Sequence, residues 1–244
     1  MKDRVDWLRL VPGLALVFGL FHGAATFLES DRGQSGILVG ALVLAATAAV
    51  YRFVSRERSD AVFRQLGLGV PRATGMIVAS AIAVLLWIAA LLFVRAKGLT
   101  GSFYPGWLSL VPGLFAQAGI AEEVLFRGYL FGQLRAGRTF WQAAMVSMVP
   151  FVGVHLILFL TMPWPIALAS VLLSVVISFP LARLFELGGS TIWPPALLHF
   201  VIQGTAKVLV FPEGGDSFAL AWMAASAAIP LLVFARFRVP RASS

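Results

Sequence analysis

The sequence predicts an all-α protein, a polytopic transmembrane helix bundle, from three observations. Apolar residues make up 59% of the 244 residues and charged residues only 12%, against about 25% charged residues in ordinary soluble domains. Several apolar stretches approach or exceed about 18 residues, the length of a membrane-spanning helix. Most lysines and arginines lie in the connections between these stretches, as expected of a protein that crosses the lipid bilayer several times.

We expect about eight spans in one integral membrane domain that comprises residues 1–244. The spans run approximately over residues 8–27, 37–54, 76–94, 107–130, 142–160, 164–184, 191–210 and 218–235. The first span follows a basic start, as in a signal peptide, but Asp3 and Asp6 in that start and the length of the run favour an uncleaved N-terminal helix. His22 in this span has no polar companion nearby and is interpreted as an interfacial or packed histidine.

The basic residues predict the orientation of the chain. With both termini in the cytoplasm, four of the nineteen lysines and arginines lie on the outer side and the other fifteen on the inner side or near it. The four are Arg32, Arg95, Lys97 and Lys207. Because basic residues favour cytoplasmic connections, we expect a multi-pass protein of the plasma (inner) membrane. We therefore attribute the net charge of +8 to basic residues in cytoplasmic connections. We expect no nucleic acid as a partner. The chain has no cysteine, which excludes disulfides and thiolate metal sites.

Ionisable side chains inside a span are costly and therefore mark a candidate functional site. The fourth span contains Glu122, Glu123 and Arg127. Glu123 and Arg127 are four residues apart, the spacing of an ion pair on one helix face. Glu122 points about 100° away from that face. A carboxylate left without this partner in apolar surroundings is suited to general acid or base chemistry.

Two further spans carry polar side chains. His155 follows Phe151 by four residues in the fifth span, and Gln203 follows His199 by four residues in the seventh. Each pair alone is also typical of packed, hydrogen-bonded residues. Because none of these groups tolerates contact with lipid tails, we expect Glu122, both histidines and the amide to converge inside the bundle.

The three motifs resemble those of the CAAX protease and bacteriocin-processing (CPBP) intramembrane proteases, which are related to type II CAAX prenyl endopeptidases. The family pattern is Glu-Glu-x-x-x-Arg, Phe-x-x-x-His and His-x-x-x-Asn on three helices. The matching segments here are Glu122-Glu123-Val-Leu-Phe-Arg127, Phe151-Val-Gly-Val-His155 and His199-Phe-Val-Ile-Gln203. The match covers about residues 107–205, which we expect to be the catalytic core.

The resemblance implies an intramembrane endopeptidase that hydrolyses a peptide bond of a peptide or protein in or at the membrane. In the family's proposed mechanism the residues corresponding to Glu122 and His155 activate a water, while His199 and the amide at position 203 stabilise the oxyanion. Gln203 stands where the family has asparagine. It keeps an amide donor, but its extra methylene moves that donor by about 1 Å or more, so the motif is compatible with an active or an inactive site.

The resemblance assigns structural support to Glu123, Arg127 and Phe151. It leaves the cofactor open: Glu122, His155 and His199 are a suitable ligand set for Zn²⁺ or another divalent metal, as in a metalloprotease, whereas a glutamate-driven reaction needs none.

Two alternatives remain open beside the protease. Gln203 also fits a non-catalytic membrane binding or immunity protein of the same architecture. Buried carboxylates and histidines also serve proton-coupled transporters.

Overall fold

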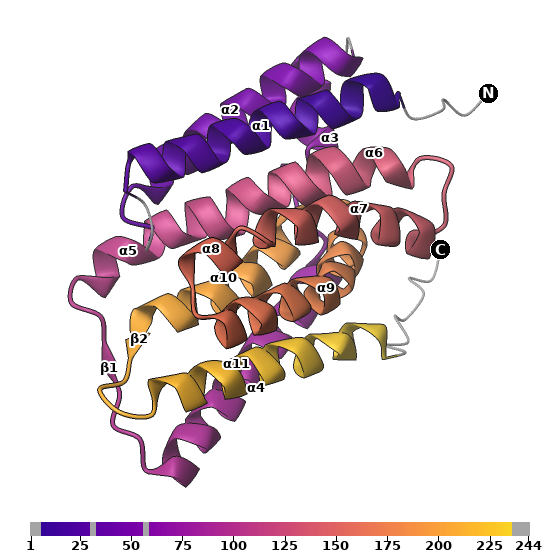
Figure 1. The fold of residues 1–244 in the computed structure, drawn as a ribbon. Coiled ribbons are helices and arrows are strands. Elements are labelled where there is room, and N and C mark those ends of the chain that lie inside the picture. Colours follow the sequence, from indigo (N-terminus) through magenta and orange to yellow (C-terminus); the bar gives the residue numbers. More distant parts are fainter. Residues whose placement is uncertain (1–5, 30–32, 56–58, 236–244) are drawn as a thin grey trace.

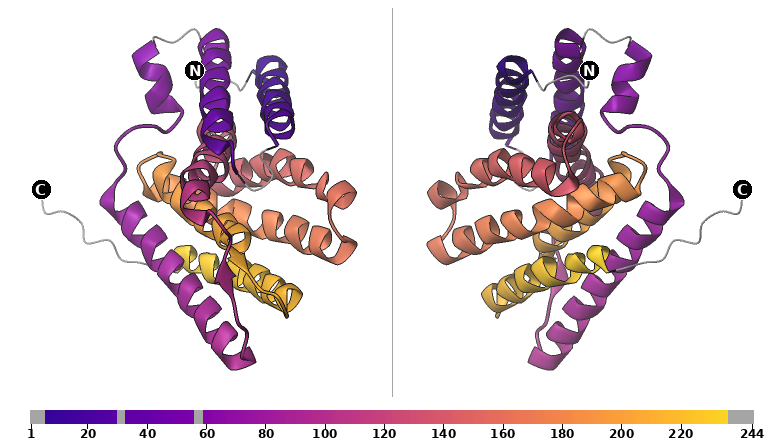
Figure 2. Two further views of the ribbon diagram at one scale, coloured as in Figure 1. Left: turned by 90° about the vertical axis from the view of Figure 1, so that its left-hand side faces the viewer. Right: turned by 90° about the vertical axis from the view of Figure 1, so that its right-hand side faces the viewer.

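The computed structural model describes residues 6–29, 33–55 and 59–235, which form a bundle of long helices (Figures 1 and 2). The predicted all-α polytopic fold is confirmed. The elements in chain order are α1 (Trp7–Phe27), α2 (Gly36–Ser55), α3 (Ser59–Gln65), α4 (Ala73–Lys97), β1 (Ser102–Phe103), α5 (Trp107–Leu114), η1 (Phe115–Ala121), η2 (Val124–Phe131), α6 (Gly132–Arg135), α7 (Phe140–His155), α8 (Leu158–Thr161), α9 (Trp164–Leu187), α10 (Trp193–Val208), β2 (Leu209–Val210), α11 (Gly215–Ala228) and η3 (Ile229–Phe234). Strands β1 and β2 pair antiparallel, with Ser102 opposite Val210 and Phe103 opposite Leu209.

Seven helical segments within the described residues are long and apolar enough to cross a membrane. They are Trp7–Phe27, Gly36–Phe53, Ala73–Lys97, Trp107–Arg135, Phe140–Thr161, Trp164–Leu187 and Gly215–Phe234. The predicted seventh span, 191–210, is instead the shorter helix α10 with 16 residues. Its length of about 24 Å falls short of the hydrocarbon core of about 30 Å. Helix α10 packs against α4, α9 and η1, so it lies inside the bundle and need not reach both membrane surfaces.

The outer ends of the first and last helices lie on the same side of the fold, since helix α1 begins and η3 ends at the same end of the bundle (Figure 1). Which end faces the cytoplasm stays a prediction. Several basic residues on which that prediction depends lie outside the described residues, namely Lys2, Arg4, Arg32, Arg56, Arg58, Arg236, Arg238 and Arg241. Asp3, which supports the prediction of an uncleaved first helix, lies outside them as well.

The bundle is built around one helix, Trp107–Arg135, which runs without a break through α5, η1, η2 and α6. We call it the central helix. Helices α1 and α2 lie together on one side of it (Figures 1 and 2), and it also contacts α7 and α10. Two π-helical segments, Phe115–Ala121 and Val124–Phe131, flank Glu122 and Glu123. The sequence predicts a regular α-helix here. Every residue of η2 is buried, so packing on all sides supports the wider π turns, which are frequent at functional sites.

Helix α7 begins with a local signal that the sequence carries. Thr139 Oγ1 accepts a hydrogen bond from the Gln142 backbone N–H at 3.3 Å, and Gln142 Oε1 accepts one from the Thr139 N–H at 3.0 Å. This reciprocal capping box satisfies donors that the first helical turn leaves unpaired. The helix continues past Pro150 and ends at His155, which places that side chain where α7 meets α8.

Helix α10 is held at its N-terminus by a connection from earlier in the chain. Pro194 and Pro195 occupy its first turn, where a missing N–H costs no helical hydrogen bond. The Trp193 indole N–H donates to the Gly69 carbonyl at 2.8 Å. This anchors the helix that carries His199.

Gly128, next to Arg127, lies where the central helix packs against Leu66. A Cβ at Gly128 would collide with the backbone carbonyl oxygen of Leu66, which cannot rotate away as a side chain can. We therefore expect Gly128→Ala to lower the free energy of unfolding by about 1–3 kcal/mol, measured by thermal unfolding in detergent. Gly19→Ala in α1 is the matched control, because no heavy atom of the described residues lies within 4 Å of a Cβ there. Equal losses of stability in the two variants would contradict this account.

Candidate active site

Glu123 lies at the centre of the bundle with no solvent-exposed surface and binds Arg127. Nη1 of Arg127 donates to Glu123 Oε1 at 3.0 Å, and the guanidinium is itself buried. The guanidinium also stacks over the Phe151 ring, with its Cζ 4.3 Å from the ring centroid. A buried arginine therefore has both a counterion and an aromatic face.

The same carboxylate oxygen binds a second helix, a contact that the sequence did not predict. Nδ1 of His199 lies 2.7 Å from Glu123 Oε1. Because a carboxylate accepts hydrogen bonds, this contact places the proton of the neutral imidazole on Nδ1 and leaves Nε2 as an acceptor. Glu123 thus fixes the ring of His199 in addition to neutralising Arg127.

Glu122 faces the other side of His199, and Gln203 bridges the two. The Gln203 amide nitrogen donates to Glu122 Oε1 at 3.3 Å and lies 2.8 Å from Nε2 of His199. The two hydrogens of the amide match these two acceptors. Nε2 of His199 is 3.7 Å from Glu122 Oε2. The sequence-predicted Glu122, His199 and Gln203 are therefore in mutual contact.

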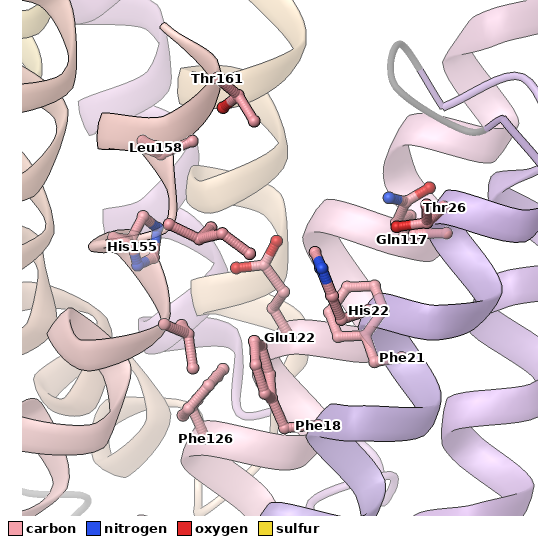
Figure 3. A pocket seen from close by; sticks show the side chains of 13 residues that line it. Phe18, Phe21, His22, Thr26, Gln117, Glu122, Phe126, His155, Leu158 and Thr161 are labelled. Carbon is pink, nitrogen blue, oxygen red and sulfur yellow. The ribbon is translucent and has the colours of Figure 1, made fainter. Parts of the chain in front are cut away.

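Glu122 also lines a cavity of about 300 Å³ that lies between α1, the central helix and the end of α7 with α8 (Figure 3). This volume is at the lower end of the range for ligand pockets, about 300–1,000 Å³. The lining residues are Phe18, Phe21, His22, Ala25, Thr26, Gln117, Glu122, Phe126, Val154, His155, Ile157, Leu158 and Thr161. The cavity is therefore largely apolar, with a few polar groups around one carboxylate.

His155 lines the same cavity as Glu122, on the opposite wall from α1 (Figure 3). Its Nδ1 lies 2.7 Å from the Phe151 carbonyl oxygen. A carbonyl oxygen only accepts, so Nδ1 carries the hydrogen and Nε2 is left as an acceptor. The Phe151 ring is 4.9 Å from the His155 ring and 6.1 Å from the His199 ring, centroid to centroid. Phe151 thus packs against both predicted histidines.

His199 and Gln203 are not among the cavity-lining residues. The site has two layers: Glu122 and His155 face the cavity, while His199 and Gln203 contact Glu122 from within the bundle. In this arrangement the Gln203 hydrogens point to Glu122 and His199, and Nε2 of His199 accepts. The oxyanion role that the family resemblance implies for these two residues would require them to exchange those hydrogen bonds.

The predicted metal set is not assembled. Within the described part of the chain, no three His, Cys, Asp or Glu side chains are grouped so as to hold a metal ion. The reason lies in His199: Glu123 engages Nδ1, Gln203 engages Nε2, and the ring lies outside the cavity that Glu122 and His155 line. The arrangement of the described residues therefore does not support a metalloprotease site formed by Glu122, His155 and His199.

The structure adds a wall to the site that the sequence analysis missed. His22, interpreted above as an interfacial or packed residue, lines the cavity with Glu122 and His155. The spacing of residues in α1 could have indicated this role, because the lining positions are three or four residues apart and so share one helix face. These positions are Phe18, Phe21, His22, Ala25 and Thr26.

Comparison with known proteins agrees with the site. Residues 104–205 match the family model of the type II CAAX prenyl endopeptidase Rce1-like proteins. The matched segment contains the central helix, α7, α9 and most of α10, and so every sequence-predicted site residue, whereas α1 lies outside it. No curated protein matches the chain.

Proposed function

Since residues 104–205 form an Rce1-like domain of the CPBP/CAAX protease family, we propose that the chain is an intramembrane endopeptidase that uses a glutamate-activated water. One observation carries the proposal. Of two adjacent carboxylates in the central helix, Glu123 is buried and binds Arg127 and His199 through Oε1, while Glu122 lines a cavity with His155. A carboxylate and an imidazole nitrogen facing one space are suited to activating a water.

The reaction follows from these positions. A water beside Glu122 and His155 gives a proton to the Glu122 carboxylate, and its oxygen forms a bond to the scissile carbonyl carbon. The C–N bond then breaks, and the proton passes from Glu122 to the leaving amine. Nε2 of His155, an acceptor in the tautomer set by the Phe151 carbonyl, orients the water. The products are a new carboxylate and a new amine.

His199 and Gln203 hold Glu122 in position for this step. Gln203 donates to Glu122 Oε1, and His199 supports Gln203 while being fixed by Glu123. A base held by packing and hydrogen bonds loses little rate to misorientation. The oxyanion role of His199 and Gln203 stays a prediction from the family resemblance.

Cleavage of defined peptides in detergent tests the proposed function. The probes are a farnesylated peptide with a C-terminal CAAX sequence, the same peptide without the farnesyl group, and a single-span apolar peptide. We expect the wild-type chain to cleave at least one of them and, in H₂¹⁸O, to place ¹⁸O in the new carboxylate. His155→Ala should lose most of the rate. Wild-type rates in both Glu122→Gln and His155→Ala, or no cleavage of any probe, would refute the proposal.

Gln203 separates an active protease from a non-catalytic binding protein. Gln203→Leu removes the donor to Glu122 and His199, and we expect a fall in kcat of about 10²–10³-fold, the range for loss of one preorganised donor. Gln203→Asn keeps the amide but shortens its reach. Its kcat should therefore lie between that of the wild type and that of Gln203→Leu. An unchanged kcat in Gln203→Leu would contradict a catalytic contribution from Gln203. A cellular function that survives combined loss of Glu122 and His199 would favour the binding protein.

A further inference from the structure

The cavity beside Glu122 has one wall that lies outside the Rce1-like domain. Helix α1 contributes Phe18, Phe21, His22, Ala25 and Thr26, and none of these belongs to residues 104–205. Figure 3 shows the His22 ring turned towards the cavity, with the Glu122 carboxylate between it and His155 in that view. A substrate that reaches Glu122 through this cavity therefore lies against α1.

None of the four sequence-predicted residues Glu122, His155, His199 and Gln203 directs a hydrogen-bond donor into this cavity. Glu122 accepts hydrogen bonds when ionised. The Nδ1 hydrogen of His155 is engaged by the Phe151 carbonyl. The hydrogens of Gln203 and His199 are directed to acceptors within the bundle. Hydrolysis of a peptide bond builds negative charge on the carbonyl oxygen, and that charge requires a donor.

His22 has the chemistry and the position for this task. Its ring stacks on Phe18, with centroids 6.2 Å apart and planes 15° from parallel. This i, i+4 contact restricts the ring's rotation. No hydrogen-bond partner of His22 occurs among the described residues, and the side chain is exposed. A neutral imidazole always has one N–H to donate. Three other lining residues carry donors, and each lies about a turn or more from the site residue on its own helix segment: Thr26 follows His22, Gln117 precedes Glu122, and Thr161 follows His155.

We propose that His22 is a substrate-binding residue of the protease site, whose ring N–H donates a hydrogen bond to the carbonyl oxygen of the scissile peptide bond. Helix α1 is then part of the active site, and the ligand of this wall is the backbone of the membrane peptide being cleaved. This inference rests on the proposed function of the cavity.

Kinetics test the donor. His22→Phe keeps a ring on Phe18 but removes the N–H, so we expect kcat to fall by about 10²-fold with KM and thermal stability little changed. His22→Gln restores an N–H donor and should recover a large part of kcat. Gly23→Ala, one residue further along α1 with open space around it, should cleave as the wild type does. A wild-type kcat in His22→Phe would overturn the inference.

Thiol protection tests the contact without relying on cleavage. The chain has no cysteine, so His22→Cys introduces its one thiol. In the Glu122→Gln background, we expect a peptide that the wild type cleaves to slow alkylation of Cys at position 22 by N-ethylmaleimide. Gly23→Cys should react equally with and without the peptide. Equal rates of alkylation at position 22 with and without the peptide would overturn the role of His22. The proposed function is tested separately, by the loss of cleavage in Glu122→Gln.

Discussion

Glu122→Gln is expected to lower kcat for peptide cleavage by about 10²–10⁴-fold, the usual contribution of a positioned general base. The glutamine side chain has the same shape and can still accept from the Gln203 amide through its oxygen, but it cannot take a proton from water. Because Glu122 borders the cavity and Glu123 holds the buried ion pair, the folded structure should remain. The measurement is kcat in detergent beside the melting temperature of the same preparation.

Two results decide how this loss is interpreted. Loss of cleavage with an unchanged melting temperature assigns the effect to chemistry. A variant that cleaves at the wild-type rate would remove Glu122 from the mechanism. Glu186→Gln is a suitable control for a lost carboxylate. Glu186 binds Arg135 and Arg183, and none of these three residues lines the cavity. The substitution should therefore leave kcat unchanged.

Glu123→Ala is expected to destabilise the protein by about 3–5 kcal/mol, the cost of removing one partner from a buried ion pair. Arg127 has 3% of its side-chain surface exposed, so its charge would stay buried without a counterion. The Nδ1 hydrogen of His199 would also lose its acceptor. Thermal and denaturant unfolding in detergent measure the effect. The adjacent Glu122→Ala should cost much less, since Glu122 borders the cavity.

A double-mutant cycle isolates the ion pair from the rest of the site. Glu123→Leu with Arg127→Met removes both charges and keeps much of the apolar volume, so the double variant should lose less stability than the two single variants added together. Strict additivity would show that Glu123 and Arg127 do not act as a pair. Activity is expected to remain low in the two variants that lack Glu123, because the Nδ1 hydrogen of His199 then has no acceptor.

The positions of the membrane-spanning helices could be predicted from the sequence, because a span needs an apolar run of defined length. The exception is α10, whose 16 residues were predicted as a full span. The residues on either side of α10 are also apolar, so the apolar run in the sequence is longer than the helix. Only the packing of α10 inside the bundle shows where the helix ends. The π-helical turns around Glu122 and Glu123 were equally invisible, because a change of helical pitch leaves no mark in residue composition.

The sequence alone determined that Glu122, Glu123, Arg127, His155, His199 and Gln203 would lie inside the bundle, because polar groups in lipid are too costly to face outward. It also separated Glu122 from Glu123, because consecutive residues on a helix point in different directions. Only the tertiary structure decided the partners. It joined His199 to Glu123 and Gln203 to Glu122, and it brought His22 to the cavity. These contacts depend on how helices distant in the chain are rotated and packed against each other, and residue spacing within one helix carries no record of that rotation.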